Sequence, residues 1–508
     1  MVNGLPPPAA ALGRLAPRAR LALSALCGAG LALVQAPVGF FPAFLILLPV
    51  LLWFVALAGT PARAALTGWI AGTAYFAVGL FWIVEPFLVD ARVHGWMAPF
   101  ALVFLAAGLA LFWGAAFGLA RWLAPRGGLA LAWAVAVSHT GFEAARAYLL
   151  TGFPWNLIAY GWLDTPIAQV SALVGPHGLG FLTILAAGLV AFGWRGVPVA
   201  LAAGAALSAW IWGDARMPET APGREEPLTV RLVQPNAAQH LKWDPEWWPV
   251  FLERSVQYTA APGAPDVIIW PETSLPFLMN DPTLDLAPLS RVAQGAPVIF
   301  GARRREPVPG WVDWYNMLVV LGDGGVVEAT YDKHHLVPFG EFMPFSRFFA
   351  RLDIQGIASE STGDYQPGPG PRVVDAAGLP PFVPLICYEA IFPHEVRPAG
   401  PRAEWLVHIT NDAWFGALVG PYQHLAQSRF RAIEQGLPVA RAANTGVSAI
   451  IDPWGRIVDE IPLGQEGFAD IALPAPAADT PYGRSGDRPL PFLLVTILAG
   501  LVLLRRKA

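Results

Sequence analysis

The segment PLICYEAIFPHE, residues 384–395, lies in the one large part of the chain that is not membrane-like in composition. An apolar run typical of a strand ends at Cys387, and Tyr388 and Glu389 follow directly. A thiol at the end of a strand is well placed to act as a nucleophile. An isolated cysteine is more often a buried structural residue, so the remainder of the chain must decide between the two interpretations.

Short apolar or alternating runs surround this segment, and each is bounded by proline, glycine or aspartate. They cover residues 228–236, 266–274, 297–304, 314–322, 381–389, 404–412 and 446–453. Helical patterns at 246–260 and 422–437 lie between some of them. Strands interleaved with helices predict a layered α/β domain.

The composition of the whole chain is that of a membrane protein. Of its 508 residues, 55% are hydrophobic and 14% are charged, whereas soluble domains average about 25% charged residues. The net charge of −4 gives no reason to expect a nucleic-acid partner. Apolar runs near the ~20 residues needed to cross a bilayer occur at 18–36, 40–59, 64–88, 97–122, 128–148, 164–193, 197–213 and 491–504.

The first run has the alternative interpretation of a signal peptide. A second run follows almost at once without a persuasive cleavage site, so we expect a retained transmembrane helix. The prediction is then eight transmembrane helices and three parts: a membrane domain over 1–217 with seven helices, a catalytic domain over 226–475, and an eighth helix over 489–505. The fifth helix is the least regular, because Glu143 and Arg146 lie near its end.

Basic residues predict the orientation in the membrane. If the N-terminus is cytoplasmic, the short outer loops carry only Arg92 and Arg146. The inner segments then carry Arg14, Arg18, Arg20, Arg63, Arg121, Arg126, Arg195, Arg505, Arg506 and Lys507. This asymmetry predicts that the polar region, about 218–488, lies on the outer face. The aromatic loop 151–162 is then either an interfacial belt or part of a mouth between the membrane helices and the outer domain.

Three polar groups follow predicted strands or turns and could meet at one edge of a sheet. Glu272 follows the run VIIW, Lys333 and Glu341 lie in YDKHHLVPFGE, and Cys387 ends the run described above. A carboxylate can take the thiol proton, and an ammonium can stabilise the thiolate and a later oxyanion. Taken singly, Glu272 could be a helix cap or a surface carboxylate, and Lys333 could be a solvated loop residue.

Taken together, the motifs WPET, YDKHHLVPFGE, ICYE and TNDAWFG resemble the nitrilase, or carbon–nitrogen hydrolase, superfamily over about 228–475. Lys333 follows Glu272 by 61 residues and precedes Cys387 by 54. The resemblance implies an α-β-β-α sandwich in which Glu272 is the general base, Lys333 the oxyanion-stabilising cation and Cys387 the nucleophile. It also implies that Glu341 supports the lysine and the base.

The membrane helices, together with the motifs QPN…LKWD, TGFPW and YGRSGD, narrow the resemblance to the apolipoprotein N-acyltransferase family of the bacterial inner membrane. That resemblance implies a phospholipid acyl donor, a thioester on Cys387, and a diacylglyceryl apolipoprotein acceptor. We expect a catalytic domain on the periplasmic face, a monomer, no cofactor and no metal. His334 and His335 are expected to be loop residues, and His177, His408 and His424 lack metal-ligand spacing.

Other residues near these motifs have open roles. Asn411 and Trp414 could line a pocket or fill the core, and Trp243 could shape an entrance or be structural. Glu389 could steer an amine or anchor its turn, and Tyr388 is a supporting candidate beside it. Residues 346–371 have no clear period and are expected to form a lid or to be disordered. Large apolar side chains in and before this segment could face lipid or pack in the core: Phe339, Phe342, Met343, Phe345, Phe348 and Phe349.

Two other functions fit some of these features. A membrane-tethered amidase would hydrolyse a small amide with water as the acyl acceptor, and a simple membrane tether would be sufficient for that activity. The third hypothesis is a membrane scaffold whose nitrilase-like domain is inactive. Eight helices exceed what a small soluble substrate requires, and the intact Glu272, Lys333 and Cys387 speak against the scaffold.

Overall fold

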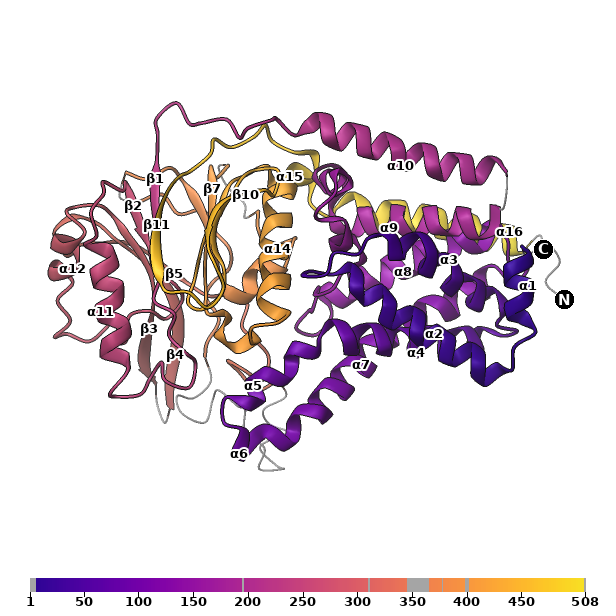
Figure 1. Cartoon of the computed structure of the whole chain (residues 1–508), viewed down its shortest axis with the longest axis horizontal. Coiled ribbons are helices and arrows are strands. Elements are labelled where there is room, and N and C mark those ends of the chain that lie inside the picture. Colours follow the sequence, from indigo (N-terminus) through magenta and orange to yellow (C-terminus); the bar gives the residue numbers. More distant parts are fainter. Residues whose placement is uncertain are drawn as a thin grey trace. The chain divides into compact units, whose positions relative to one another are not determined.

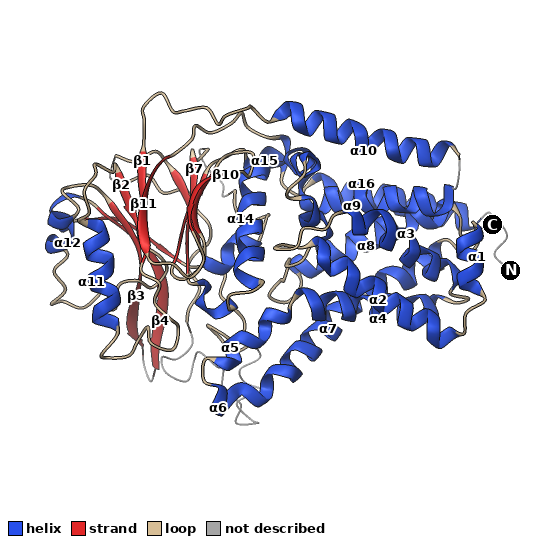
Figure 2. Cartoon of the chain, viewed as in Figure 1, coloured by secondary structure: helices blue, strands red, loops and turns tan. Residues whose placement is uncertain are grey.

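The computed structural model describes residues 6–193, 196–308, 311–344, 365–376, 378–397 and 402–506. The chain forms two compact units (Figures 1 and 2). The helical unit comprises Met1–Val84, Ala91–Met217 and Thr480–Ala508, and the strand-containing unit comprises Glu85–Asp90 and Pro218–Asp479. The predicted lid at 346–371 lies mostly outside the described residues, as do Phe345, Phe348 and Phe349.

In the helical unit, each apolar run that the sequence predicts as a membrane helix contains a helix, although the run 64–88 is broken after Gly79. The main helices of this unit are α1 (Pro7–Gly13), α2 (Pro17–Leu31), α3 (Pro42–Leu57), α4 (Pro61–Gly79), α7 (Ala98–Leu123), α8 (Leu129–Tyr148), α9 (Ser171–Gly193), α10 (Val197–Arg216), α15 (Pro481–Ser485) and α16 (Pro489–Arg506). Several carry proline in the first turn, where its missing N–H leaves no hydrogen bond unmade and its fixed φ suits the helix.

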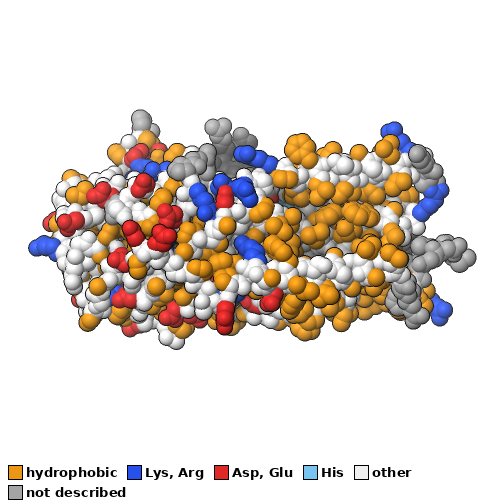
Figure 3. All heavy atoms as spheres, turned by 90° about the horizontal axis from the view of Figure 1, so that it is seen from above, with side chains coloured by type: hydrophobic (Ala, Val, Ile, Leu, Met, Phe, Trp, Pro, Cys, Tyr) orange, Lys and Arg blue, Asp and Glu red, His pale blue; other side chains and the backbone are white. Residues whose placement is uncertain are grey.

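Five helices of the described residues are long and apolar enough to cross a membrane, and a sixth candidate is the bent pair Pro61–Gly79 and Phe81–Leu88. Pro42–Leu57 is a shorter apolar helix. The count of eight spans therefore stays a prediction. On α10 and α16, large apolar side chains face outward, including Val197 at 72% exposure and Phe492 at 77%. Figure 3 shows apolar side chains gathered over the helical unit, as expected of a surface that contacts lipid.

The aromatic loop 151–162 is buried inside the helical unit rather than displayed as an interfacial belt. Trp155 is fully buried, and Tyr160 and Trp162 are nearly so. Tyr75 donates to the carbonyl of Asn156 at 2.9 Å, and Arg146 donates to the carbonyl of Trp155 at 2.8 Å. The belt interpretation is therefore wrong, because these aromatic side chains pack inside the helical unit and are not displayed on its surface.

The strand-containing unit has two sheets. The first has the order β11-β1-β2-β3-β4-β5 and the second β10-β9-β8-β7-β6. Their strands are β1 (Thr229–Gln234), β2 (Val267–Ile269), β3 (Val298–Val308), β4 (Trp311–Leu321), β5 (Val327–Asp332), β6 (Phe382–Ile386), β7 (Trp405–Thr410), β8 (Val439–Ala443), β9 (Ser448–Ile451), β10 (Ile457–Ile461) and β11 (Gly467–Ala472). The strands β1, β2 and β3 are parallel to one another, as are β6, β7 and β8.

Three apolar clusters give the layers. One cluster joins the inner faces of the two sheets, with Ile269 and Ile386 among its fully buried residues. The outer face of the first sheet packs on α11 (Trp248–Thr259) and α12 (Ala287–Val292), and that of the second on α14 (Gly420–Gln435). The expected α-β-β-α sandwich is confirmed. The carboxyl ends of β2 and β6 deliver Glu272 and Cys387.

Candidate active site

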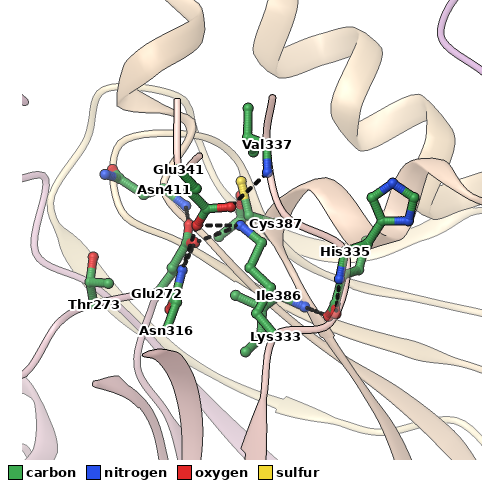
Figure 4. Close-up of polar contacts among 12 residues, drawn as sticks. Glu272, Thr273, Asn316, Lys333, His335, Val337, Glu341, Ile386, Cys387 and Asn411 are labelled. Atoms are coloured by element: carbon green, nitrogen blue, oxygen red, sulfur yellow. Dashed lines mark hydrogen bonds and ion pairs between the residues drawn. The ribbon is translucent and has the colours of Figure 1, made fainter. Parts of the chain in front are cut away.

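Cys387 lies at a sharp turn between β6 and the 3-10 helix η8 (Cys387–Ile391). Its φ is +51°, a left-handed conformation that non-glycine residues seldom adopt and that is frequent at functional sites. The residue is 5% exposed. In Figure 4 its sulfur lies beside the carboxyl groups of Glu272 and Glu341 and the end of Lys333, in agreement with the electrostatic coupling among these groups.

Glu272 follows β2 and is held by donors from both sheets. Its Oε1 accepts from Asn316 Nδ2 at 2.7 Å and from Lys333 Nζ at 3.3 Å, and its Oε2 accepts from the backbone N–H of Asn411 at 2.9 Å. Gly301 on β3 permits this position, because a Cβ there would lie 2.5 Å from the Cα of Glu272. The carboxylate is therefore fixed in one orientation and 6% exposed.

Lys333 follows β5 and is almost fully buried between two carboxylates. Its Nζ lies 2.9 Å from Oε1 of Glu341 and 3.3 Å from Oε1 of Glu272. Asn316 on β4 bridges the same two oxygens, since its Nδ2 also donates to Glu341 at 3.0 Å. The second oxygen of Glu341 accepts from the backbone N–H of Val337 at 2.8 Å. Figure 4 shows this network of dashed contacts.

The electrostatics fix the resting charges of the three central groups. Burial favours a neutral Glu272, but Lys333, Asn316 and Lys242 together hold its pKa below the ordinary value. Burial likewise opposes the charge of Lys333, yet Glu341 and then Glu272 raise the pKa of the ammonium above its ordinary value. Burial, reinforced by the charge of Glu272, raises the pKa of the Cys387 thiol. The resting site is thus a carboxylate, an ammonium and a neutral thiol.

Lys242 is a further buried cation beside Glu272, and the sequence motif LKWD did not reveal its contacts. Its Nζ donates to the carbonyl of Glu272 at 3.1 Å and to Oγ1 of Thr273 at 2.6 Å. Burial, which outweighs the attraction of Glu272, lowers the pKa of Lys242 to about 7. Thr273 has φ +46°, so both ends of the candidate site carry strained backbone.

A pocket of about 360 Å³, including the solvent at its mouth, lies on the side of Glu272 that faces Lys242. Lys242, Trp243, Thr273 and Asn444 line it together with apolar residues of α11. Trp243 is 39% exposed, and the guanidinium of Arg303 lies 3.9 Å from the centre of its ring. Trp243 thus lines the pocket and also packs on Arg303, so the entrance role and the structural role both stay predictions.

The carbonyl oxygen of Cys387 is held by two histidines that the sequence did not connect with the site. Nε2 of His408 lies 3.2 Å from it and Nε2 of His424 lies 3.1 Å from it. Nδ1 of His424 lies 2.9 Å from Oδ1 of Asp412, and the other carboxyl oxygen of Asp412 accepts from Arg441. These residues are essentially fully buried. The strained peptide of Cys387, the candidate nucleophile, is therefore held by a buried network of hydrogen bonds.

Glu389 and Tyr388, the two site candidates next to Cys387 in the sequence, lie on the side of its turn that faces His334 and His335. Glu389 is fully buried, and it accepts from the backbone N–H of Ile386 at 2.7 Å and of His334 at 2.8 Å. Of the two roles considered, these contacts favour the anchoring of the turn. Tyr388 packs its ring 5.7 Å from that of His335.

The structure thus brings together five of the predicted site residues: Glu272, Lys333, Glu341, Cys387 and Asn411. The side chain of Asn411 bonds Gln239 at 2.8 Å and Asn444 at 2.8 Å. Trp414 is half-buried in the 3-10 helix η9 (Asp412–Phe415). Asn316 was missed, although a lone amide within the apolar run WYNMLVVLG was a usable signal of a buried polar role.

Comparison with protein families gives two matches. Residues 27–189 match the apolipoprotein N-acyltransferase N-terminal domain, and residues 229–480 match the carbon–nitrogen hydrolase domain. The curated proteins named apolipoprotein N-acyltransferase include one from Rhodopseudomonas palustris, 37% identical over 96% of this chain and 95% of its own. One from Caulobacter vibrioides is 38% identical over 95% of this chain and 93% of its own.

Among solved structures, an amidase from Nesterenkonia sp. AN1 is 18% identical to this chain, with a TM-score of 0.36. The match covers 54% of this chain and 99% of the amidase. At that level of similarity no conclusion about function follows.

Proposed function

Because the chain belongs to the apolipoprotein N-acyltransferase family, we propose that it moves a fatty acyl chain from a membrane phospholipid to a lipoprotein in two steps. The acyl group is first held as a thioester on Cys387. It then passes to the N-terminal α-amino group of the diacylglyceryl-cysteine of an apolipoprotein. The observation that carries the proposal is the buried carboxylate, ammonium and thiol of Glu272, Lys333 and Cys387.

The first step begins with a neutral thiol, because its raised pKa leaves little free thiolate. Sγ of Cys387 attacks the ester carbonyl of the phospholipid while Glu272 takes the thiol proton. The carbonyl oxygen becomes an oxyanion, and the fixed ammonium of Lys333 stabilises it. The C–O bond then breaks, and the lysophospholipid alcohol leaves with the proton from Glu272.

The second step repeats the chemistry with an amine. The neutral α-amino group attacks the thioester carbonyl, Glu272 accepts one of its protons, and Lys333 again stabilises the oxyanion. The C–S bond breaks, the amide is complete, and the departing sulfur recovers a proton from Glu272. Glu341 and Asn316 hold Lys333 and Glu272 at their separation throughout, which suits a positioning role for both.

The placement in the cell is part of the same proposal. The chain acts as a monomer in the bacterial inner membrane, with residues 1–217 as a seven-helix membrane domain and 489–505 as an eighth helix. Residues 226–475 form the catalytic domain on the periplasmic face. The apolar outward surfaces of α10 and α16 and the arginines that end α16 support this arrangement. Both substrates are lipid-anchored, so a membrane-bound catalyst suits them.

The experiment offers the purified protein two acceptors. It receives a phospholipid with a labelled acyl chain, together with a diacylglyceryl lipopeptide that has either a free or an acetylated α-amino group. We expect label in an amide of the free lipopeptide alone. Release of labelled fatty acid at the same rate with either lipopeptide, or efficient hydrolysis of a small amide, would instead support a hydrolase.

A further inference from the structure

A cluster of metal-ligating side chains lies on the far side of the Cys387 turn, outside the catalytic network. The cluster is His334, His335 and Glu395, whose nitrogen and oxygen ligand atoms all lie within 4.8 Å of one another. Nε2 of His334 lies 3.0 Å from Oε2 of Glu395, and Nδ1 of His335 lies 2.9 Å from Oε1. In a tetrahedral zinc site with bonds of ~2.0–2.1 Å, neighbouring ligand atoms are about 3.3 Å apart, so only small shifts are needed.

The imidazole of His394 lies beside the same carboxylate, with Nε2 3.7 Å from Oε1 of Glu395, but it is outside the group of three whose ligand atoms lie together. Two imidazoles and one carboxylate, with water as a fourth ligand, are a donor set that suits zinc and related divalent transition metals. The side chains of His334, His335, His394 and Glu395 retain between 12% and 18% exposure, so an ion could enter from solvent.

The surroundings of His334 have the arrangement that supports a metal-bound histidine. Its second nitrogen, Nδ1, lies 2.6 Å from Oε1 of the fully buried Glu389 and 2.7 Å from the hydroxyl of Tyr331. A carboxylate on the far nitrogen is the usual partner of a ligating imidazole, because it orients the ring and increases the basicity of the ligand atom. The ring of His335 is stacked on Phe392 with centroids 3.6 Å apart, which also fixes its direction.

We propose that His334, His335 and Glu395 bind one divalent transition-metal ion of the zinc class, with a water molecule as the fourth ligand. The ion replaces the imidazole protons that otherwise form the hydrogen bonds between the two histidines and Glu395. It thereby joins the loop after β5, which carries the histidines, to the segment after η8, which carries Glu395. Glu389 connects the metal site with the Cys387 turn, because it also accepts a hydrogen bond from the backbone N–H of Ile386. The ion therefore stiffens that turn from the side opposite Glu272 and Lys333.

This inference does not depend on the proposed acyl transfer, and no sequence motif indicates the site. His334 and Glu395 are 61 residues apart, and no regular ligand spacing links them. Only the approach of the β5 and β6 ends brings them together.

The test uses the full chain without a histidine tag, purified in detergent and stripped with a chelator. Zn²⁺ alone is titrated and counted by elemental analysis, and Co²⁺ replaces it for visible absorption spectroscopy. We expect one equivalent of bound metal, the intense d–d bands of tetrahedral Co²⁺, and a rise in melting temperature on addition of Zn²⁺. Glu395→Gln and His335→Asn should each weaken binding by at least ~10-fold and remove the bands.

His240→Ala is the matched control, because His240 is an exposed histidine away from the cluster and its loss should change none of these readings. The melting temperatures of the metal-free variants show whether they fold. The wild-type spectrum decides the matter by itself: absence of stoichiometric binding or of nitrogen-ligated Co²⁺ bands overturns the proposal. Retention of the bands in both Glu395→Gln and His335→Asn overturns it as well.

Discussion

The backbone N–H of Asn411 donates to Oε2 of Glu272 at 2.9 Å and thereby joins the two sheets of the sandwich. Asn411 follows β7 of the second sheet, while Glu272 follows β2 of the first. The candidate base thus depends on both halves of the fold for its orientation. The three central side chains likewise come from both sheets, because Glu272 and Lys333 follow strands of the first sheet and Cys387 follows a strand of the second.

Asn316 is the first target, because one amide nitrogen serves both carboxylates. Asn316→Ala leaves two buried oxygens with fewer donors, so we expect a loss of about 1–3 kcal/mol in the free energy of unfolding and a lower kcat/KM. Chemical denaturation and acyl-transfer kinetics measure the two effects. Asn280→Ala, which removes an exposed amide, should stay within about 0.5 kcal/mol. Equal stability of the two variants would contradict this role.

Lys333 should govern the acid limb of the pH–rate profile. Its ammonium helps to hold the pKa of Glu272 below the ordinary value, so Glu272 remains deprotonated in mildly acidic solution. In Lys333→Met that pKa rises, and the acid limb of kcat/KM should move to higher pH. The rate should also fall roughly 10²–10³-fold through loss of oxyanion stabilisation. Lys333→Arg keeps the charge and should leave the limb in place; an unmoved limb in Lys333→Met would contradict the assignment.

Lys242 should make stability depend on alkaline pH. Its folded-state pKa is about 7, below that of the unfolded chain, because burial disfavours its charge. Folding therefore expels a proton, and the cost of doing so shrinks as pH rises from about 7 toward the ordinary lysine value near 10.4. Wild type should gain stability relative to Lys242→Met across this window. Melting temperatures of both proteins at a series of pH values check this, and parallel curves would be inconsistent with it.

His424 should matter for turnover more than for substrate binding. It lies 3.1 Å from the carbonyl oxygen of Cys387, and Asp412 holds its other nitrogen. His424→Ala should let the strained peptide relax and lower kcat about 10–100-fold, with KM little changed. Ser428→Ala is the matched control, because Ser428 bonds His408 and the backbone carbonyl of His424 and, among the described residues, has no hydrogen bond to the carbonyl of Cys387. A change in KM alone would argue against a positioning role.

The sequence predicted those parts of the fold that have strong local signals. The runs that became β1, β2, β3, β4, β6, β7 and β9 are rich in Val, Ile and Leu and are bounded by Pro, Gly or Asp. The strand VARAA of β8 has low strand propensity and is recognisable only by its place between β7 and β9. The runs of β5, β10 and β11 carry acidic residues at partly exposed positions, so their apolar pattern is weak.

The candidate site divides in the same way. Glu272, Lys333 and Cys387 follow strands or lie in motifs shared with the family, so their proximity in the fold could be predicted. Asn316 and Lys242 act through partners far away in the sequence, and so do the histidines beneath Cys387. Such contacts depend on the stacking of two sheets, which no local pattern contains.

The most direct test of the proposed thioester is the mass of the protein after incubation with a phospholipid and no acceptor. We expect one acyl group on Cys387, attached through a bond that neutral hydroxylamine cleaves, and none on Cys387→Ala. Cys27 is the internal control, because it is the chain's other thiol and lies in α2 of the helical unit. An acyl group on any other residue, or undiminished acyl transfer by Cys387→Ala, would rule out Cys387 as the nucleophile.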